Sequence, residues 1–175
     1  DKARVEYFNQ RNLIYIYHNT IDAIGDDKKT ELNTFSAVNT AILELKNLIT
    51  KVHSQFAVGR VLITSDHGFL FNYNDLPSAS FQTAPKGEHA KSHNRYILTN
   101  DTSKVTNSYE MNLSDCSNVS SDLKLLTPKA INRYKRQGSG AHFVHGGASL
   151  QEMIIPLIES TRKRVDIGKK VPFRI

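Results

Sequence analysis

The sequence predicts an α/β fold in which a mostly parallel sheet is sandwiched by helices. Two apolar runs of strand length, residues 12–18 and 61–65, each end in polar side chains. Between them, residues 34–53 repeat apolar side chains at spacings of three and four, which is the period of a long amphipathic helix. A strand, a helix and a strand form a βαβ unit, and a right-handed crossover of this kind joins two parallel strands.

Composition sets broad limits on the class of protein. A chain of 175 residues is one domain by length and can bury an ordinary core. Its single cysteine excludes an intrachain disulfide and favours a reducing, cytoplasmic location. No apolar run reaches about 18 residues, so we expect no membrane span. The formal charge of +6 favours anionic partners such as phosphate esters or nucleic acid. Because the chain begins at Asp1 rather than at a methionine, we expect an incomplete fragment of a larger domain.

The elements of the βαβ unit can be placed from the residue pattern. The first strand covers residues 13–17, and the helix begins at Asn33 or Thr34 and ends between His53 and Phe56. Gly59 then lets the chain turn into a strand at residues 60–65. The helix is expected to bury its apolar face, which carries Phe35, Val38, Ile42, Leu45 and Ile49.

The middle of the chain, at about residues 72–127, is predicted to be an insertion of loops with small strands at 95–99 and 109–113. A stripe of basic side chains runs through it: Lys86, His89, Lys91, His93 and Arg95. A solvated loop surface is the ordinary interpretation of such a stripe. Contact with a phosphate or a polynucleotide backbone is the alternative.

A second organised stretch follows the insertion. Phe143 and Val144 are predicted to end a short strand, with His145 at its tip and two glycines behind it. Ser149 and Glu152 have the spacing of a capping box that opens a short helix, so their role is interpreted as structural. Residues 157–161 are predicted to form a further strand, which either returns along the sheet or lies at its edge.

Polar side chains with metal-ligand chemistry follow both strands of the βαβ unit. His18, Asp22 and Asp26 come after the first strand, and Asp66 and His67 come after the second. Each set alone is better explained as an ordinary turn, for the first set with a helix cap, than as a metal site. Parallel strands, however, end at the same edge of a sheet, so the two sets are expected to meet there. An aspartate beside a histidine offers an oxygen and a nitrogen, which suit zinc or manganese.

Three segments, residues 16–26, 61–70 and 143–156, together carry a resemblance to a known family. Their order and separation resemble the PglZ domain of bacterial BREX phage-defence systems, a member of the alkaline phosphatase superfamily. The resemblance covers about residues 13–161 and implies an alkaline-phosphatase-like fold. It also implies that residues 1–175 are the carboxyl-terminal part of that domain, with the insertion at about 72–127.

The resemblance implies a site with two divalent metal ions, zinc or manganese, of which this chain holds part. Its metal ligands in this sequence are Asp22, Asp26, Asp66, His67 and His145. Asp26 stands where the superfamily usually has a histidine, which leaves the identity of the first metal open. The catalytic nucleophile of the superfamily, a serine or threonine, lies upstream of the matched region, so the fragment alone is expected to be inactive. Arg95 and His18 are candidate substrate contacts.

The implied function is that of a metal-dependent phosphohydrolase, a phosphodiesterase or nuclease-like enzyme that acts on a phosphate ester or nucleic acid. Other components of the defence complex are the expected partners. The alternative is a non-catalytic assembly or nucleic-acid-contacting module, which the basic stripe, Asp26 and the missing nucleophile support. A geometric expectation separates the two: in the enzyme, Asp22, Asp66, His67 and His145 should lie within roughly 8 Å of a common point.

Overall fold

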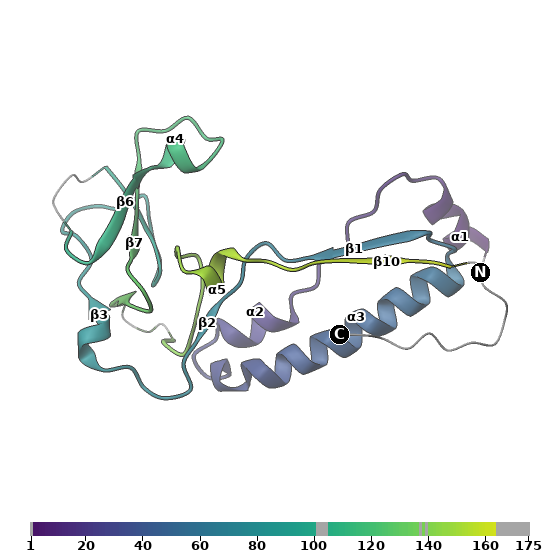
Figure 1. Ribbon diagram of the computed structural model, residues 1–175, viewed down its shortest axis with the longest axis horizontal. Coiled ribbons are helices and arrows are strands. Elements are labelled where there is room, and N and C mark those ends of the chain that lie inside the picture. Colours follow the sequence, from purple (N-terminus) through teal and green to yellow (C-terminus); the bar gives the residue numbers. More distant parts are fainter. Residues whose placement is uncertain (1, 101–104, 137, 139, 164–175) are drawn as a thin grey trace.

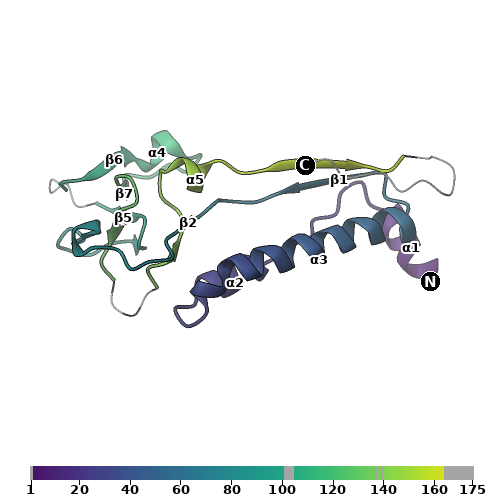
Figure 2. The same ribbon diagram turned by 60° about the horizontal axis from the view of Figure 1, so that its bottom comes forward.

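The computed structural model describes residues 2–100, 105–136, 138 and 140–163, which form a long arm and a compact end (Figure 1). The arm consists of α1 (Lys2–Asn9), α2 (Thr20–Gly25), η1 (Glu31–Asn33), α3 (Thr34–Gln55), β1 (Arg60–Thr64) and β10 (Leu157–Thr161). In the turned view, α3 runs lengthwise beside the ribbon that β1 and β10 make (Figure 2). The long helix and the strand after it therefore form where the residue periodicity predicts them.

The compact end is built from short elements. They are β2 (Leu70–Phe71), η2 (Ser78–Ser80), β3 (Phe81–Gln82), β4 (Lys91–Ser92), β5 (Ile97–Thr99), β6 (Ser108–Asn112), α4 (Leu113–Cys116), β7 (Lys124–Pro128), β8 (Arg133–Tyr134), β9 (Phe143–Val144) and α5 (Leu150–Met153). Strands β4, β5, β7 and β6 form an antiparallel sheet in that order. Ile97, Leu126 and Tyr134 make its buried core. The expected loops and small strands of the insertion are thus present, and they have a core of their own.

The prediction of a mostly parallel sheet is wrong. Strand β1 pairs antiparallel with β10, from Arg60 opposite Thr161 to Thr64 opposite Leu157. Strands β2 and β9 are also antiparallel, and among the described strands only β3 and β8 pair in parallel. A βαβ pattern fixes the direction of two strands but not their hydrogen-bonded neighbours. Among the described strands, the partner of β1 is β10, which comes far later in the chain and runs in the opposite direction.

The predicted first strand has no partner in the described residues. Residues 13–17 belong to no strand, and Leu13 and Tyr17 are 67% and 93% exposed. The segment nevertheless leads from α1 toward α2, in the same direction as β1 runs (Figure 1). The chain direction expected of a βαβ unit is therefore kept, while the pairing is not.

Helix α3 buries a different face from the predicted one. Its buried side chains are Thr34, Ala37, Ala41 and Val52. Phe35 and Ile42 were expected inside but are 57% and 58% exposed, whereas the other three predicted positions, Val38, Leu45 and Ile49, are half-buried. Helix α2 packs against α3, and the small alanines on that face allow the close approach. Apolar periodicity gave the helix correctly, but the packing partner selected the buried face.

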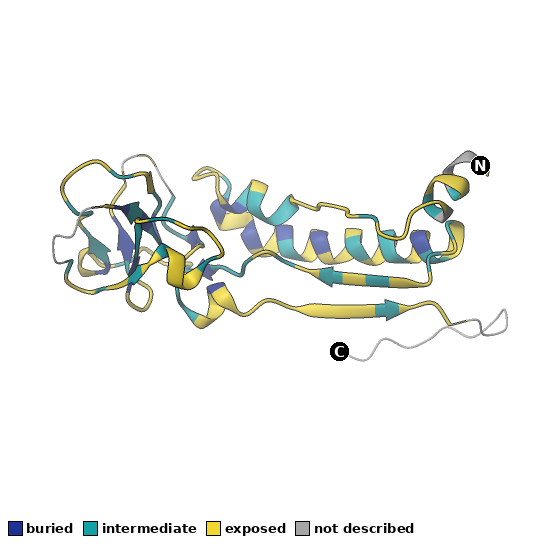
Figure 3. Cartoon of the chain, turned by 90° about the horizontal axis from the view of Figure 1, so that it is seen from above, coloured by how far each residue is buried: buried dark blue, intermediate teal, exposed yellow. Residues whose placement is uncertain are grey.

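Most residues of the ribbon that β1 and β10 make are exposed (Figure 3). On the ribbon of β1 and β10, Leu62, Leu157 and Ile158 are 54%, 75% and 50% exposed. Each of these two strands also has one edge without a partner among the described residues. Among those residues, no helix is long and apolar enough to cross a membrane.

Candidate metal centre

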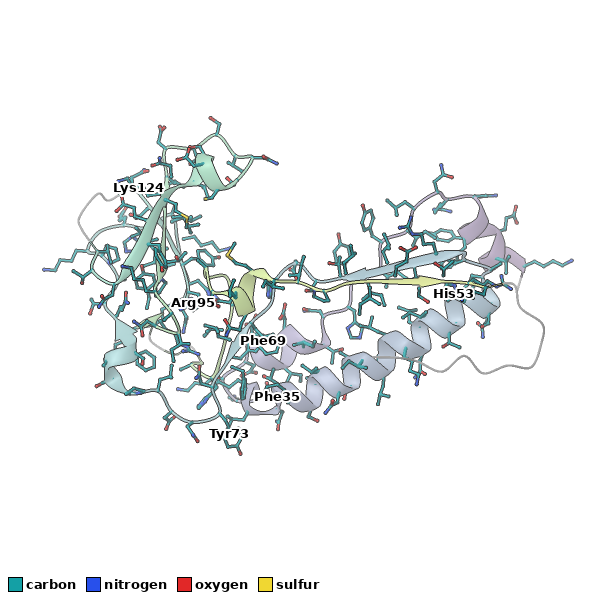
Figure 4. The ribbon with its side chains drawn as sticks, viewed as in Figure 1. Phe35, His53, Phe69, Tyr73, Arg95 and Lys124 are labelled. Carbon is teal, nitrogen blue, oxygen red and sulfur yellow. The ribbon has the colours of Figure 1, made fainter. Side chains whose placement is uncertain are left out.

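The predicted ligands come together where the arm joins the compact end. In the stick view this junction is marked by Phe69, which follows the Asp66-His67 pair and Gly68 in the chain (Figure 4). Asp66 and His67 follow β1, Asp22 lies in the first turn of α2, and His145 follows β9. Elements distant in the sequence therefore deliver these side chains to one place.

His67 is held so that one ring nitrogen faces the two carboxylates. Its Nδ1 lies 3.0 Å from the carbonyl oxygen of Gly68. Since a carbonyl can only accept, Nδ1 carries the proton in this bond, and in the neutral ring the lone pair is then on Nε2. That Nε2 lies 3.5 Å from Oδ2 of Asp22 and 3.8 Å from Oδ2 of Asp66. A metal-binding histidine usually has this arrangement, with the second nitrogen bonded to a carbonyl or carboxylate.

Asp22, Asp66 and His67 fit a divalent metal ion. One ligand atom from each lies within 4.8 Å of the other two. The side chain of Asp22 is 31% exposed and that of Asp66 85%, so the cluster opens to solvent on one side. Two carboxylates and one imidazole with an open position form a donor set that suits a catalytic zinc or manganese ion.

His145 and Asp26 extend the cluster. The ring of His145 stacks on that of His67, with centroids 4.0 Å apart and an interplanar angle of 2°. Its Nε2 lies 3.2 Å from Oδ1 of Asp26, but the two atoms are not aligned for a hydrogen bond. The structure therefore brings all five predicted ligands to the junction: Asp22, Asp26, Asp66, His67 and His145. Their role as ligands remains a prediction.

Close backbone packing fixes two of these elements. A Cβ at Gly25, the last residue of α2, would lie 2.6 Å from the ring of Phe143 in β9. Glycine thus lets α2, with Asp22 and Asp26, approach the strand that carries His145. At Gly68, the backbone N–H donates to the carbonyl oxygen of Glu152 at 2.8 Å, and an added Cβ would overlap the carbonyl oxygen of Gln151. The loop after His67 is therefore seated directly on α5.

A buried ion pair beneath the site was not foreseen. Arg95 donates from Nε and Nη2 to the two carboxylate oxygens of Glu152, at 2.8 and 2.7 Å, and both side chains are fully buried. Arg95 also donates to the carbonyl oxygens of Asn132 and Ala130. Figure 4 shows Arg95 beside α5. The donors of its guanidinium are directed to Glu152 and to backbone carbonyls, so the structure does not place Arg95 as a substrate contact.

Glu152 connects the two ligand-bearing loops. Its carboxylate accepts from the N–H of Gly147 at 2.9 Å, two residues after His145, while its backbone carbonyl holds Gly68, one residue after His67. Burial raises the pKa of Glu152, but hydrogen bonds from Arg95, Ser149 and Gly147 and the charge of Arg95 outweigh burial and leave the pKa below its usual range. The capping box of Ser149 and Glu152 is confirmed. Its glutamate has this second, non-local role.

Two further residues matter to the placement of the site. The carboxylate of Glu31, which is buried, accepts from the backbone N–H groups of His142 and Phe143 at 2.9 and 3.2 Å and so fixes the start of β9. An isolated glutamate before a helix gave no sequence signal for this role. His18, the other candidate substrate contact, bonds through Nε2 to Glu44 of α3 at 2.7 Å. The structure therefore ties His18 to the arm.

Comparison with known proteins gives matches to a family model and to two named relatives. A family model described as the BREX system PglZ alkaline phosphatase-like domain matches residues 2–160. The alkaline phosphatase-like protein BrxZ of Escherichia coli O9:H4 (strain HS) is 38% identical over 165 residues, 93% of this chain. The alkaline phosphatase-like protein PglZ of Bacillus cereus (strain H3081.97) is 29% identical over 164 residues, 94% of this chain. In each case the chain spans 19% of the relative's length. No solved structure matches the chain.

Proposed function

Because the chain belongs to the BREX PglZ alkaline phosphatase-like domain family, we propose that it supplies part of a divalent-metal site for hydrolysis of a phosphodiester. The substrate class is a phosphate ester, with nucleic acid as the form that the phage-defence setting and the positive charge of the chain favour. The proposed location is the cytoplasm, where the exposed free thiol of Cys116 would stay reduced.

One observation carries this proposal. The ligand atoms of Asp22, Asp66 and His67 lie within 4.8 Å of one another, and the hydrogen bond from Nδ1 of His67 to Gly68 leaves Nε2 ready to bind. The secondary structure alone does not explain why Asp22 of α2 and the loop after β1 bring their ligand atoms together. Binding of one metal ion by all three side chains would explain it.

Each residue has a definite part in the proposed chemistry. Asp22, Asp66 and His67 would hold one ion. His145 and Asp26, whose Nε2 and Oδ1 lie 3.2 Å apart, would hold the second. When bound, divalent ions polarise phosphoryl oxygens and lower the pKa of a nucleophilic hydroxyl or water. No serine or threonine of this chain is assigned as the nucleophile, which is proposed to come from another part of a longer protein. Glu152 and Arg95 keep the two ligand loops at a fixed separation.

A zinc or manganese titration of the full-length protein tests the proposal. Wild-type protein should bind the ion and hydrolyse bis(p-nitrophenyl) phosphate, a simple phosphodiester. Asp66→Asn should weaken metal binding by at least tenfold, because a ligand oxygen is replaced by a neutral amide. Asp27→Asn is the matched control, since Asp27 is an exposed carboxylate one residue beyond Asp26. Equal metal affinity of wild type and Asp66→Asn would remove the proposal.

The second candidate function is an assembly role in the defence complex. The exposed apolar side chains on β1 and β10 favour it, because contiguous exposed apolar surface marks contact with other protein segments. Retained phage defence in a variant that lacks both Asp66 and His67 side chains would favour this role over hydrolysis. Loss of defence, with the protein still folded, would favour the enzyme.

A further inference from the structure

A third histidine reaches the site from the insertion. His93 lies in the turn between β4 and β5, where Ser92 pairs with Ile97. Its backbone N–H donates to the carbonyl oxygen of Tyr96 at 2.8 Å, and its ring stacks on the Tyr96 ring with centroids 5.3 Å apart. The hairpin and the tyrosine therefore hold the imidazole in one orientation.

The ring of His93 faces the metal centre. Its centroid lies 5.2 Å from that of His145, which in turn stacks on His67. The three imidazoles form a row that leads from the insertion to the cluster of Asp22, Asp66 and His67. The insertion has its own sheet of β4, β5, β7 and β6 with its own buried core. The contact between the rings of His93 and His145 is therefore not needed to complete the packing of that sheet.

Two ring nitrogens in this row are buried without a hydrogen-bond partner among the described residues. They are Nδ1 of His93 and Nε2 of His145. Buried polar atoms are nearly always paired, so the unpaired Nδ1 of His93 indicates a bound group. The proposed second metal accounts for Nε2 of His145, which faces Asp26 at 3.2 Å. A single metal ion does not explain both. Within the described part of the chain, the set of three ligand atoms within 4.8 Å of one another is that of Asp22, Asp66 and His67, without His93.

The charges around His93 indicate the sign of the bound group. Lys91 comes two residues before His93, and its Nζ lies 5.9 Å from the centroid of the Tyr96 ring on which His93 stacks. An imidazole N–H can donate a hydrogen bond, and the ammonium group of Lys91 attracts negative charge. A group with several oxygens and a negative charge, such as a phosphate, can span the distance that one ion cannot.

We propose that His93 is a substrate-contacting residue, whose ring donates a hydrogen bond to an oxygen of a phosphate group bound beside His145, while Lys91 adds attractive charge. The inference rests on the proposed function and names the residue by which the insertion takes part in it. It assigns phosphate recognition to the insertion and metal binding to the arm and its junction.

The test compares metal affinity with phosphate affinity in the full-length protein. Zinc binding is measured first, and inorganic phosphate binding to the zinc-loaded protein is then measured by calorimetry. His93→Ala should keep the zinc affinity and weaken phosphate binding by about tenfold or more, because a hydrogen bond to a charged group is lost. His89→Ala is the matched control. His89 lies in the same insertion and also has a buried Nδ1 without a partner among the described residues, but its Nε2 bonds to the Pro85 carbonyl oxygen, and its ring is not part of the row of His67, His145 and His93. His89→Ala should leave both affinities unchanged.

Conservative variants keep the test decisive if His93→Ala unfolds. His93→Asn and His93→Gln carry an amide donor near the positions of Nδ1 and Nε2 respectively, and one of them should retain more phosphate affinity than alanine. Phosphate binding of equal strength in wild type and in all folded His93 variants would overturn the inference while the metal site stands. Loss of zinc affinity in His93→Ala would also overturn it, because His93 would then act on the metal. A wild type that binds no zinc would instead refute the proposed function.

Discussion

The imidazoles of His67 and His145 lie parallel, with centroids 4.0 Å apart. These residues are far apart in the sequence and follow different strands, β1 and β9. Parallel stacking gives the two rings a common orientation. The Nε2 of His67 faces Asp22 in α2, and the Nε2 of His145 faces Asp26 at the carboxyl-terminal cap of the same helix. The two histidines should therefore depend on each other in binding a metal.

Removing either ring should weaken metal binding. We expect His67→Ala and His145→Ala each to lower zinc affinity at least tenfold, because each removes a nitrogen donor from the cluster. The decrease in zinc affinity of the double variant should be smaller than the product of the two single decreases, because the effects of residues in contact are coupled. Calorimetric titration of the four proteins measures both effects. Unchanged heats in the double variant would exclude a metal role for the pair.

The buried ion pair of Arg95 and Glu152 should be important for stability. Arg95→Met leaves the carboxylate of Glu152 buried without its partner, and loss of one partner of a buried pair costs about 3–5 kcal/mol. Arg60→Met breaks an exposed pair with Glu159 and should cost less than about 1 kcal/mol. Urea unfolding of both variants tests the difference. A similar decrease in unfolding free energy in both variants would show that burial of the Arg95–Glu152 pair does not increase its contribution to stability.

Stability should also depend on pH through Glu152. Its pKa in the folded protein is lowered, so in acid the unfolded state binds more protons than the folded state. The stabilising contribution is therefore present above its ordinary pKa, 4.5, and is lost as the pH falls through the folded value. Unfolding free energies measured from about pH 6 to pH 3 should show the gap between wild type and Glu152→Gln narrowing in acid. A gap that widens would contradict this direction.

Gly68 should not tolerate a side chain. Gly68→Ala directs a methyl group at the carbonyl oxygen of Gln151, and such overpacking costs about 1–3 kcal/mol. The loop would move away from α5 and carry His67 with it, so zinc affinity should fall as well. Gly59→Ala has open space around the added methyl and should be neutral or slightly stabilising. Thermal unfolding and zinc titration of both variants test the pair.

The buried face of α3 can be tested by two neighbouring substitutions. Ala41 is 1% exposed, and Ala41→Leu should destabilise the fold by about 1–3 kcal/mol because α2 leaves no room. Ile42 is 58% exposed, and Ile42→Ala should change stability by less than about 0.5 kcal/mol. If Ile42→Ala were the more damaging substitution, then the face predicted from periodicity would be the correct one.

Local patterns in the sequence predicted local structure well. The helix of residues 34–55, the strand that ends before Asp66 and the capping box at Ser149 all depend on neighbours within a few positions. Periodicity and cap chemistry contain that information. Strand pairing does not depend on neighbours of this kind. The partner of β1 comes about 95 positions later, and no pattern within residues 60–65 indicates whether that partner runs parallel or antiparallel.

The site shows the same division. Asp66, His67 and His145 could be found because polar ligand-type residues at strand ends are unusual and because the three motifs occur together. Arg95 was predicted as a substrate contact because its sequence neighbours are basic loop residues, whereas in the structure it is buried and paired with Glu152. Its actual partner, Glu152, is 57 positions away and already had a local explanation as a cap. A residue that serves two roles shows only the local one in the sequence.

The open edge of β1 has a consequence for handling this segment apart from the rest of a longer polypeptide. Tyr15 and Tyr17 are exposed, and β1 and β10 each have one edge that is unpaired among the described residues. Unpaired backbone beside apolar side chains recruits strands from other molecules. Expressed in isolation, the segment should therefore self-associate through edge-to-edge strand addition in a concentration-dependent manner. A lysine placed at Tyr15 or Leu62 should suppress that aggregation without touching the metal centre.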